Sequence, residues 1–149
     1  MMTKEELKKT LLKGERVTLE CKLAQSNVPN DVWRSYSAFA NTYGGLILLG
    51  VDEDLKEKDL SKRFTITGVN DASKIRKDFW NVVNNPEKVN VNLLRDEDVD
   101  IIDMDGKMVV AIQVPQADYN TRPVFINNNP LRGRSSATTR ATTIAQRSW

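Results

Sequence analysis

The apolar run Leu46–Val51 constrains the fold more than any other part of this 149-residue chain. Gly44 and Gly45 stand directly before it, and glycine permits the positive backbone dihedrals of a sharp turn. An unbroken apolar run of this length is typical of a strand buried on both faces, because a half-buried strand alternates. The run is much shorter than the ~20 residues that span a bilayer. It therefore predicts a buried strand in a soluble protein.

Three segments have the apolar spacing of amphipathic helices, and each has a candidate cap at its start. The expected caps are Thr3 with Glu6 as a capping box, Asn30, and Asn70 or Asp71. The first helix is expected to stop at Gly14. The apolar positions that support the three helices are Leu7, Leu11 and Leu12; Val32, Tyr36, Phe39 and Ala40; and Ile75, Phe79, Val82 and Val83.

Strand patterns alternate with these helices along the chain. Strict alternation predicts a half-buried strand at 17–23, and shorter or weaker patterns occur at 64–69, 89–94 and 124–126. Asp105-Gly106 lies between the apolar segments 99–104 and 107–114, a strong hairpin signal. The charged stretch 52–63 has no apolar period and is expected to be a surface loop. The mixed order predicts one α+β (mixed α/β) domain with a mixed sheet, about three helices and a C-terminal β-hairpin.

Composition excludes several kinds of active site. The chain has no histidine and one cysteine, Cys21, so a zinc site, a histidine base and an internal disulfide are all excluded. No phosphate-binding Gly-x-x-x-x-Gly-Lys-Ser/Thr loop is present, so ATP binding is not supported. Any catalysis has to use carboxylates, lysine, tyrosine or Cys21. Met1 leads directly into polar residues, which predicts a cytoplasmic protein without a membrane partner.

The net charge of +2 is unevenly distributed. Residues 131–149 contain four arginines and no acid, so 18 basic and 20 acidic residues remain in residues 1–130, a net charge of −2. The body of the protein is therefore not basic. A surface that binds a polyanion would have to come from local clustering of positive side chains.

Carboxylates remain as the candidate chemistry. Glu20 and Lys22 lie two apart on the polar face of the first expected strand, where a solvated ion pair is the simpler explanation. Asp52 follows the apolar strand, and Asp54 could substitute for it; an acid there is often only the first solvated residue. Glu15 lies five residues before Glu20, so strict alternation places it on the opposite face unless the chain bends at Gly14.

Other signals also have structural explanations. For the segment Phe39–Gly45, a tightly packed end of a helix is the better explanation from the residues alone. Trp33, Tyr36 and Tyr43 could stack on bases, yet aromatic residues at helical spacing more often lie in a core. Arg122 precedes a proline and could face a phosphate or simply occupy a surface turn.

The motifs taken together resemble the Schlafen-type AlbA domain family. They are Glu20-Cys-Lys, the run Ser37-Ala-Phe-Ala-Asn-Thr-Tyr-Gly-Gly-Leu-Ile-Leu-Leu-Gly-Val-Asp52, Thr67-Gly-Val, Val110 to Pro115, and Arg122-Pro-Val-Phe, in the family's order. The resemblance covers roughly residues 14–131, and its central run is the most specific part. Members are described as candidate DNA-binding domains, often in bacterial transcriptional regulators or helicase-related proteins.

The resemblance implies a nucleic-acid-binding module, DNA or RNA, that forms part of a longer regulator. Lys22 and Arg122 are the residues expected to contact nucleic acid. An alternative is a metal-dependent ribonuclease, because Glu15, Glu20 and Asp52 match the Glu/Glu/Asp site of vertebrate Schlafens; oxygen ligands of this kind hold Mg²⁺ or Mn²⁺. A second alternative is a non-catalytic module that forms homo-oligomers through an exposed sheet edge.

The domain is expected to occupy residues 1–131, followed by a tail at 132–149. The tail is rich in Ser, Thr and Arg and has no apolar period, which predicts disorder. Similar bacterial chains continue after this point with Lys-Gly-Thr-Tyr/Phe-Lys-Arg and then Asn-His-Glu-Gly-Asp-Tyr. Synonymous codons for 132–149 exist whose shifted frame encodes this pattern. We therefore expect a frameshift after Leu131 that replaces a closing strand with a non-native tail.

Overall fold

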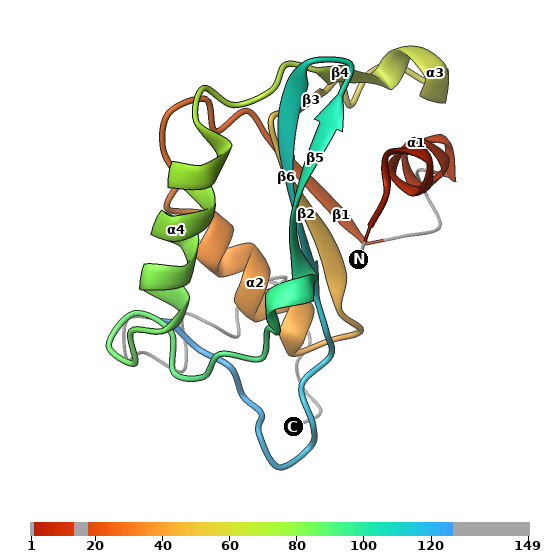
Figure 1. Cartoon of the computed structure of the whole chain (residues 1–149). Coiled ribbons are helices and arrows are strands. Elements are labelled where there is room, and N and C mark those ends of the chain that lie inside the picture. Colours follow the sequence, from red (N-terminus) through yellow and green to blue (C-terminus); the bar gives the residue numbers. More distant parts are fainter. Residues whose placement is uncertain (1, 14–17, 127–149) are drawn as a thin grey trace.

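The computed structural model describes residues 2–13 and 18–126, and the expected tail at 132–149 lies outside them. Helices and strands follow one another in mixed order (Figure 1). The helices are α1 (Lys4–Lys13), α2 (Val32–Ala40), α3 (Leu60–Arg63) and α4 (Ala72–Val83). The strands are β1 (Leu19–Lys22), β2 (Gly45–Leu49), β3 (Val51–Glu53), β4 (Phe64–Ile66), β5 (Val99–Met104) and β6 (Lys107–Val114). A 3-10 turn at Asp96–Asp98 precedes β5.

The main sheet has four strands in the order β1-β2-β6-β5. β1 runs parallel to β2, whereas β6 is antiparallel to both β2 and β5. β3 and β4 form a separate antiparallel pair. The expected α+β fold with a mixed sheet is therefore confirmed.

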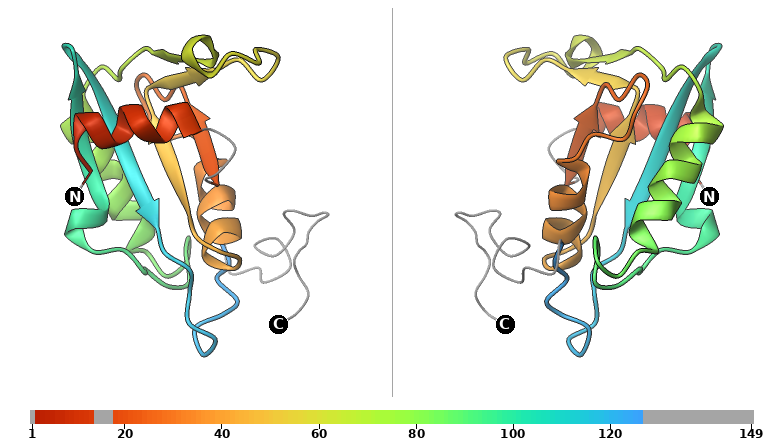
Figure 2. Two further views of the ribbon diagram at one scale, coloured as in Figure 1. Left: turned by 90° about the vertical axis from the view of Figure 1, so that its right-hand side faces the viewer. Right: turned by 90° about the vertical axis from the view of Figure 1, so that its left-hand side faces the viewer.

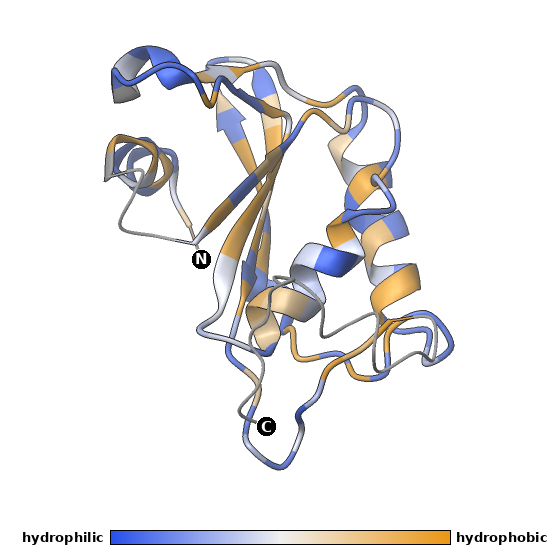
Figure 3. Ribbon diagram, turned by 180° about the vertical axis from the view of Figure 1, so that it is seen from behind, coloured by the Kyte–Doolittle hydropathy of each residue, from blue (hydrophilic) through white to orange (hydrophobic). Residues whose placement is uncertain are grey.

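Helices cover both faces of this sheet. α2 and α4 pack on one face and α1 lies across the other (Figure 2). Hydrophobic residues lie along the strands of the sheet and within the helices that cover it (Figure 3), and the buried ones pack between helices and sheet. Two clusters result, a larger one under α2 and α4 and a smaller one under α1.

The side chains of the apolar run Leu46–Val51 are divided between these two clusters. Leu46 and Leu48 pack under α1, and Ile47 and Leu49 pack under α2 and α4. The strand is thus buried on both faces, as its unbroken apolar character predicts. Gly45 fits here because a Cβ atom would come within 2.5 Å of the Phe39 ring.

The predicted hairpin forms at Asp105-Gly106. These residues have φ values of 57° and 92°, the left-handed conformation that a two-residue type I′ turn requires at both positions. Met104 pairs with Lys107 across the turn, and the Asp103 carboxylate accepts a hydrogen bond from the Gly106 N–H at 2.7 Å. The turn fixes the register of the whole β5–β6 ladder.

The Thr3–Glu6 capping box and the Asp71 cap form as expected. Four local expectations are wrong. The stretch 52–63 contains the short helix α3, because the Asp59 carboxylate accepts from the Ser61 N–H and caps it. Asp31, not Asn30, is the N-cap residue of α2. The expected strands at 89–94 and 124–126 do not form; these two segments share one isolated bridge, between Val89 and Ile126. Among the described residues, no helix is long and apolar enough to cross a membrane.

Candidate nucleic-acid interface

The predicted residues Glu20 and Lys22 lie together and are joined by a third side chain, Asp31. Lys22 Nζ donates to Asp31 Oδ2 at 2.6 Å and lies 3.2 Å from Glu20 Oε2. We call Glu20, Lys22 and Asp31 the Lys22 network. β1 positions its first two members on one face, because Leu19 and Cys21 point into the cluster under α1. The chain then returns to this strand end just before α2, which brings in Asp31.

The two carboxylates of the network stabilise the positive charge of Lys22. Burial alone would lower the pKa of Lys22, but its hydrogen bonds to Asp31 and Glu20 outweigh this effect and raise the pKa above its ordinary value. Lys22 therefore stays protonated at neutral pH. Cys21, between these residues, is different: burial raises the pKa of its thiol to about 12, with Glu53 and Glu20 adding to the effect. A neutral thiol is a poor nucleophile, so Cys21 is not suited to nucleophilic catalysis.

Gly50 determines where Asp52 points. Strict alternation from Leu48 would turn Val51 toward α2, yet Val51 packs in the cluster under α1. Gly50 has a φ of +100°, and its N–H donates to the Lys22 carbonyl at 2.8 Å. This kink reverses the alternation. Asp52 is exposed and, one residue after Val51, it points away from the cluster under α1, as Glu20 and Lys22 do.

The donor set for a metal is incomplete in the described part of the chain. Glu15, the third predicted ligand, lies outside the described residues. Among residues 2–13 and 18–126, no three His, Cys, Asp or Glu side chains come close enough together to hold a metal ion. Glu20 is moreover paired with Lys22, whose ammonium occupies the place that a cation would take. The described carboxylates alone do not fit a Mg²⁺ or Mn²⁺ site.

Arg122 lies at the other end of α2 from Lys22. Its N–H donates to the Asp118 carbonyl, and the Ala117 N–H donates to Ala40 in the last turn of α2. Lys22, in contrast, contacts Asp31 at the start of α2. The nine residues of α2 rise about 14 Å at 1.5 Å per residue. The two predicted contacts are thus separated by the length of this helix.

Asn41, from the central motif, has a structural role that the sequence did not reveal. Its amide group pairs with the backbone of buried Val124: Nδ2 donates to the carbonyl at 2.7 Å and Oδ1 accepts from the N–H at 2.7 Å. Ser37 Oγ donates to the same carbonyl at 2.5 Å. Asn90 makes a similar contact, as its Oδ1 accepts from the Phe125 N–H at 2.8 Å. These side chains hold segment 123–126, directly after Arg122, against the helices.

The aromatic candidates separate by burial. Trp33 stacks on Phe79 at 4.9 Å between ring centroids and belongs to the core. Tyr36 is fully buried, and its hydroxyl donates to the Val91 carbonyl and accepts from the Leu93 N–H. Tyr43 is 89% exposed. Of the three, only Tyr43 is accessible for stacking on a base.

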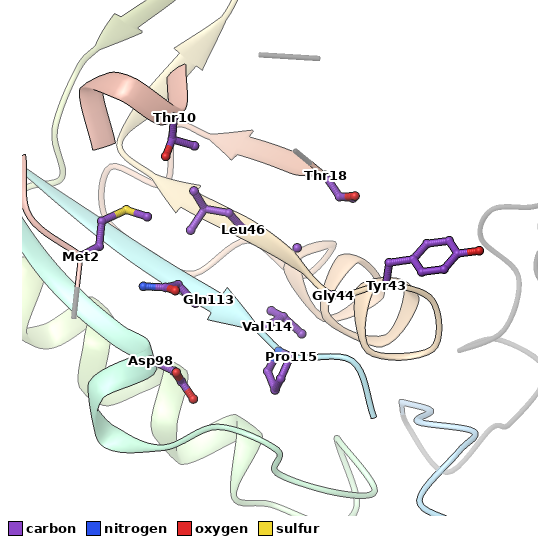
Figure 4. Close-up of a pocket in the computed structure, with 11 residues that line it drawn as sticks. Met2, Thr10, Thr18, Tyr43, Gly44, Leu46, Asp98, Gln113, Val114 and Pro115 are labelled. Carbon is purple, nitrogen blue, oxygen red and sulfur yellow. The ribbon is translucent and has the colours of Figure 1, made fainter. Parts of the chain in front are cut away.

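A hollow of about 550 Å³ lies beside Gly44 and Gly45, and no sequence pattern predicts it. Its wall includes the polar side chains of Thr10, Thr18 and Gln113 (Figure 4). Glu20, Lys22, Asp52 and Arg122 do not line it. The hollow is therefore separate from the predicted interface.

Comparisons with known proteins agree with the motifs. A model of the family described as Schlafen, AlbA_2 matches residues 15–143. One similar solved structure is the N-terminal domain of a RecG-related protein from Nitrosomonas europaea, described as a candidate ATP-dependent DNA helicase; it is 26% identical, the match covers 91% of this chain and 87% of that one, and the TM-score is 0.69.

A second structure, the DIP2311 protein from Corynebacterium diphtheriae, is 20% identical, with coverage of 76% of this chain and 20% of that one and a TM-score of 0.47. No curated protein matches. The family match spans most of the sequence and includes Glu20, Lys22, the central motif and Arg122. The chain therefore belongs to the Schlafen AlbA_2 family.

Proposed function

We propose that this chain is a nucleic-acid-binding module, a part of a longer cytoplasmic regulator, that contacts phosphates through Lys22 and Arg122. The observation that carries the proposal is its membership of the Schlafen AlbA_2 family. Its likeness to the N-terminal domain of a helicase-related protein supports the same conclusion. DNA is the first ligand to test, because that relative is described as related to a DNA helicase.

The arrangement of positive side chains favours a path along α2. Lys22 lies near the start of this helix and Arg122 near its end. Between them, Arg34 is an exposed residue of α2 that lines a groove of about 490 Å³ together with Lys88. A duplex advances about 3.4 Å per base pair along its axis, so roughly four base pairs match the 14 Å length of α2.

The test is the salt dependence of binding in single variants. Each phosphate contact contributes about 0.9 to the slope of log affinity against log salt for duplex DNA. We expect weak binding with a shallow slope, since few cations are involved, and a lower affinity in both Lys22→Met and Arg122→Met. Lys56→Met, on the exposed β3–α3 loop, is the matched control. Equal affinities of all three variants and the unaltered chain would remove Lys22 and Arg122 from the interface.

A second candidate function is a metal-dependent ribonuclease with Glu15, Glu20 and Asp52 as ligands. It is favoured by one observation: β1, which carries Glu20, contacts β3, which carries Asp52, and each of these residues lies next to a side chain of the cluster under α1. In this role the three carboxylates would hold Mg²⁺ or Mn²⁺, and the ion would activate water and stabilise charge on the phosphate. Cleavage of a structured RNA with and without Mn²⁺ tests it. We expect Glu20→Gln to abolish cleavage; unchanged cleavage in that variant would exclude this site.

A further inference from the structure

The Lys22 network contains one positive and two negative charges, so the residue best placed to meet a phosphate is already paired. Lys22 donates to Asp31 at 2.6 Å and lies 3.2 Å from Glu20. Its side chain is only 23% exposed, whereas that of Asp31 is 49% exposed. A phosphate that approaches Lys22 from solvent therefore meets a net charge of −1 and an ammonium group whose donors are largely used.

The side chain of Asp31 does not cap α2, although Asp31 stands at the N-cap position of this helix. It is the N-cap residue of α2, where an aspartate ordinarily accepts a backbone N–H from the first turn. Here it makes no side-chain capping bond. The carboxylate is directed to Lys22 instead, nine residues earlier in the chain. Removal of its charge should consequently leave the helix intact.

We infer that Asp31 restrains nucleic-acid binding by occupying Lys22, so that a phosphate must displace this carboxylate before it can bind. The inference rests on the proposed function. Asp31 thus sets how available Lys22 is. When the ion pair between Lys22 and Asp31 breaks, Glu20 on β1 remains as the second partner and keeps Lys22 near the surface.

The energetic consequence has two parts. A unit charge about 4 to 7 Å from a phosphate contributes 0.6 to 1 kcal/mol in water, so its loss corresponds to roughly a threefold to fivefold change in affinity. In the unaltered chain Lys22 makes its phosphate contact only in complexes in which it has left Asp31, so its full release should steepen the salt slope by up to about 0.9 for duplex DNA. A charge removed elsewhere on the surface has the first effect only weakly and lacks the second.

The test compares Asp31→Asn with Asp105→Asn in the full chain, using a fluorescein-labelled DNA duplex between about 50 and 200 mM salt. Asp105 is a matched control because it also pairs with a lysine, Lys4, but on the α1 side of the sheet. Asn-Gly also favours the type I′ turn, so the hairpin is kept. We expect Asp31→Asn to bind threefold to fivefold more tightly with a steeper slope, and Asp105→Asn to bind like the unaltered chain.

A double-mutant cycle locates the origin of the gain. In a Lys22→Met background, Asp31→Asn should lose the added slope, because no lysine is left to release. Thermal unfolding checks that each variant is folded, and Asp31→Ser offers a second neutral residue suited to an N-cap. Equal affinity of Asp31→Asn and Asp105→Asn, or a steeper slope that persists without Lys22, would overturn the inference. Failure of every variant to bind DNA or RNA would instead refute the proposed function.

Discussion

Replacement of Asn41 by alanine should destabilise the domain strongly although Asn41 touches no ligand in this account. The side chain is 5% exposed and pairs with both backbone groups of Val124. After the substitution, the Val124 carbonyl keeps the Ser37 hydroxyl as a donor. The Val124 N–H loses its acceptor, Asn41 Oδ1. A buried donor without a partner costs about 1 to 3 kcal/mol.

The volume left by the missing amide group adds about 1 kcal/mol. We therefore expect the free energy of unfolding of Asn41→Ala to fall by about 2 to 4 kcal/mol, measured by urea denaturation followed through tryptophan fluorescence. Asn81→Ala is the control, because Asn81 is an exposed residue of α4, and it should change stability by less than about 0.5 kcal/mol. If Asn41→Ala is as stable as Asn81→Ala, the amide does not hold segment 123–126.

Three further predictions concern packing, titration and the end of the chain. Gly45→Ala should cost about 1 to 3 kcal/mol in the same assay, because its Cβ would lie 2.5 Å from the Phe39 ring; full stability would show that the ring can move at no cost. Cys21, with a thiol pKa of about 12, should resist alkylation at pH 8 until urea unfolds the chain, and rapid labelling of the folded protein would contradict this. The free energy of unfolding should also fall as pH rises from about 9 to 12, because the thiol loses its proton in the unfolded chain while the folded thiol keeps it. Sequencing of the coding DNA should reveal a single-base insertion or deletion near codon 131, and its absence would make residues 132–149 a genuine extension.

Features fixed by neighbours in the sequence were predictable. The Thr3–Glu6 capping box needs residues three apart, and the Asp105-Gly106 turn needs two adjacent residues with positive φ. The alternation of Glu20 and Lys22 likewise follows from strand geometry alone. In each case the physical cause acts over a few residues, so the sequence pattern contains it.

Contacts between distant segments were not predictable in the same way. Lys22 meets Asp31 because the chain turns back between β1 and α2, and Asn41 meets Val124 across 83 positions. Neither contact leaves a periodic signal. The side on which Asp52 lies depends on the kink at Gly50, which reverses an alternation that a pattern alone would continue.

The helix α3 was not predicted, although the cap that begins it is local in the sequence. Asp59 caps it locally, but the helix has only four residues and no apolar period, so a charged loop was the better prediction from sequence. Trp33 and Tyr36 were correctly weighed as core residues, since their helical spacing with Phe39 and Ala40 matches the buried face of α2. Burial separated them from exposed Tyr43.

We propose that the domain itself, and not the arginine-containing segment 132–149, binds nucleic acid. The most direct measurement is the affinity of the chain ending at Leu131 for labelled duplex DNA, compared with the full chain, after circular dichroism has shown that both are folded. We predict that the shorter chain keeps weak, salt-sensitive binding that Lys22→Met reduces. Loss of all binding with the fold intact would assign the affinity to nonspecific contacts of residues 132–149 and contradict the account.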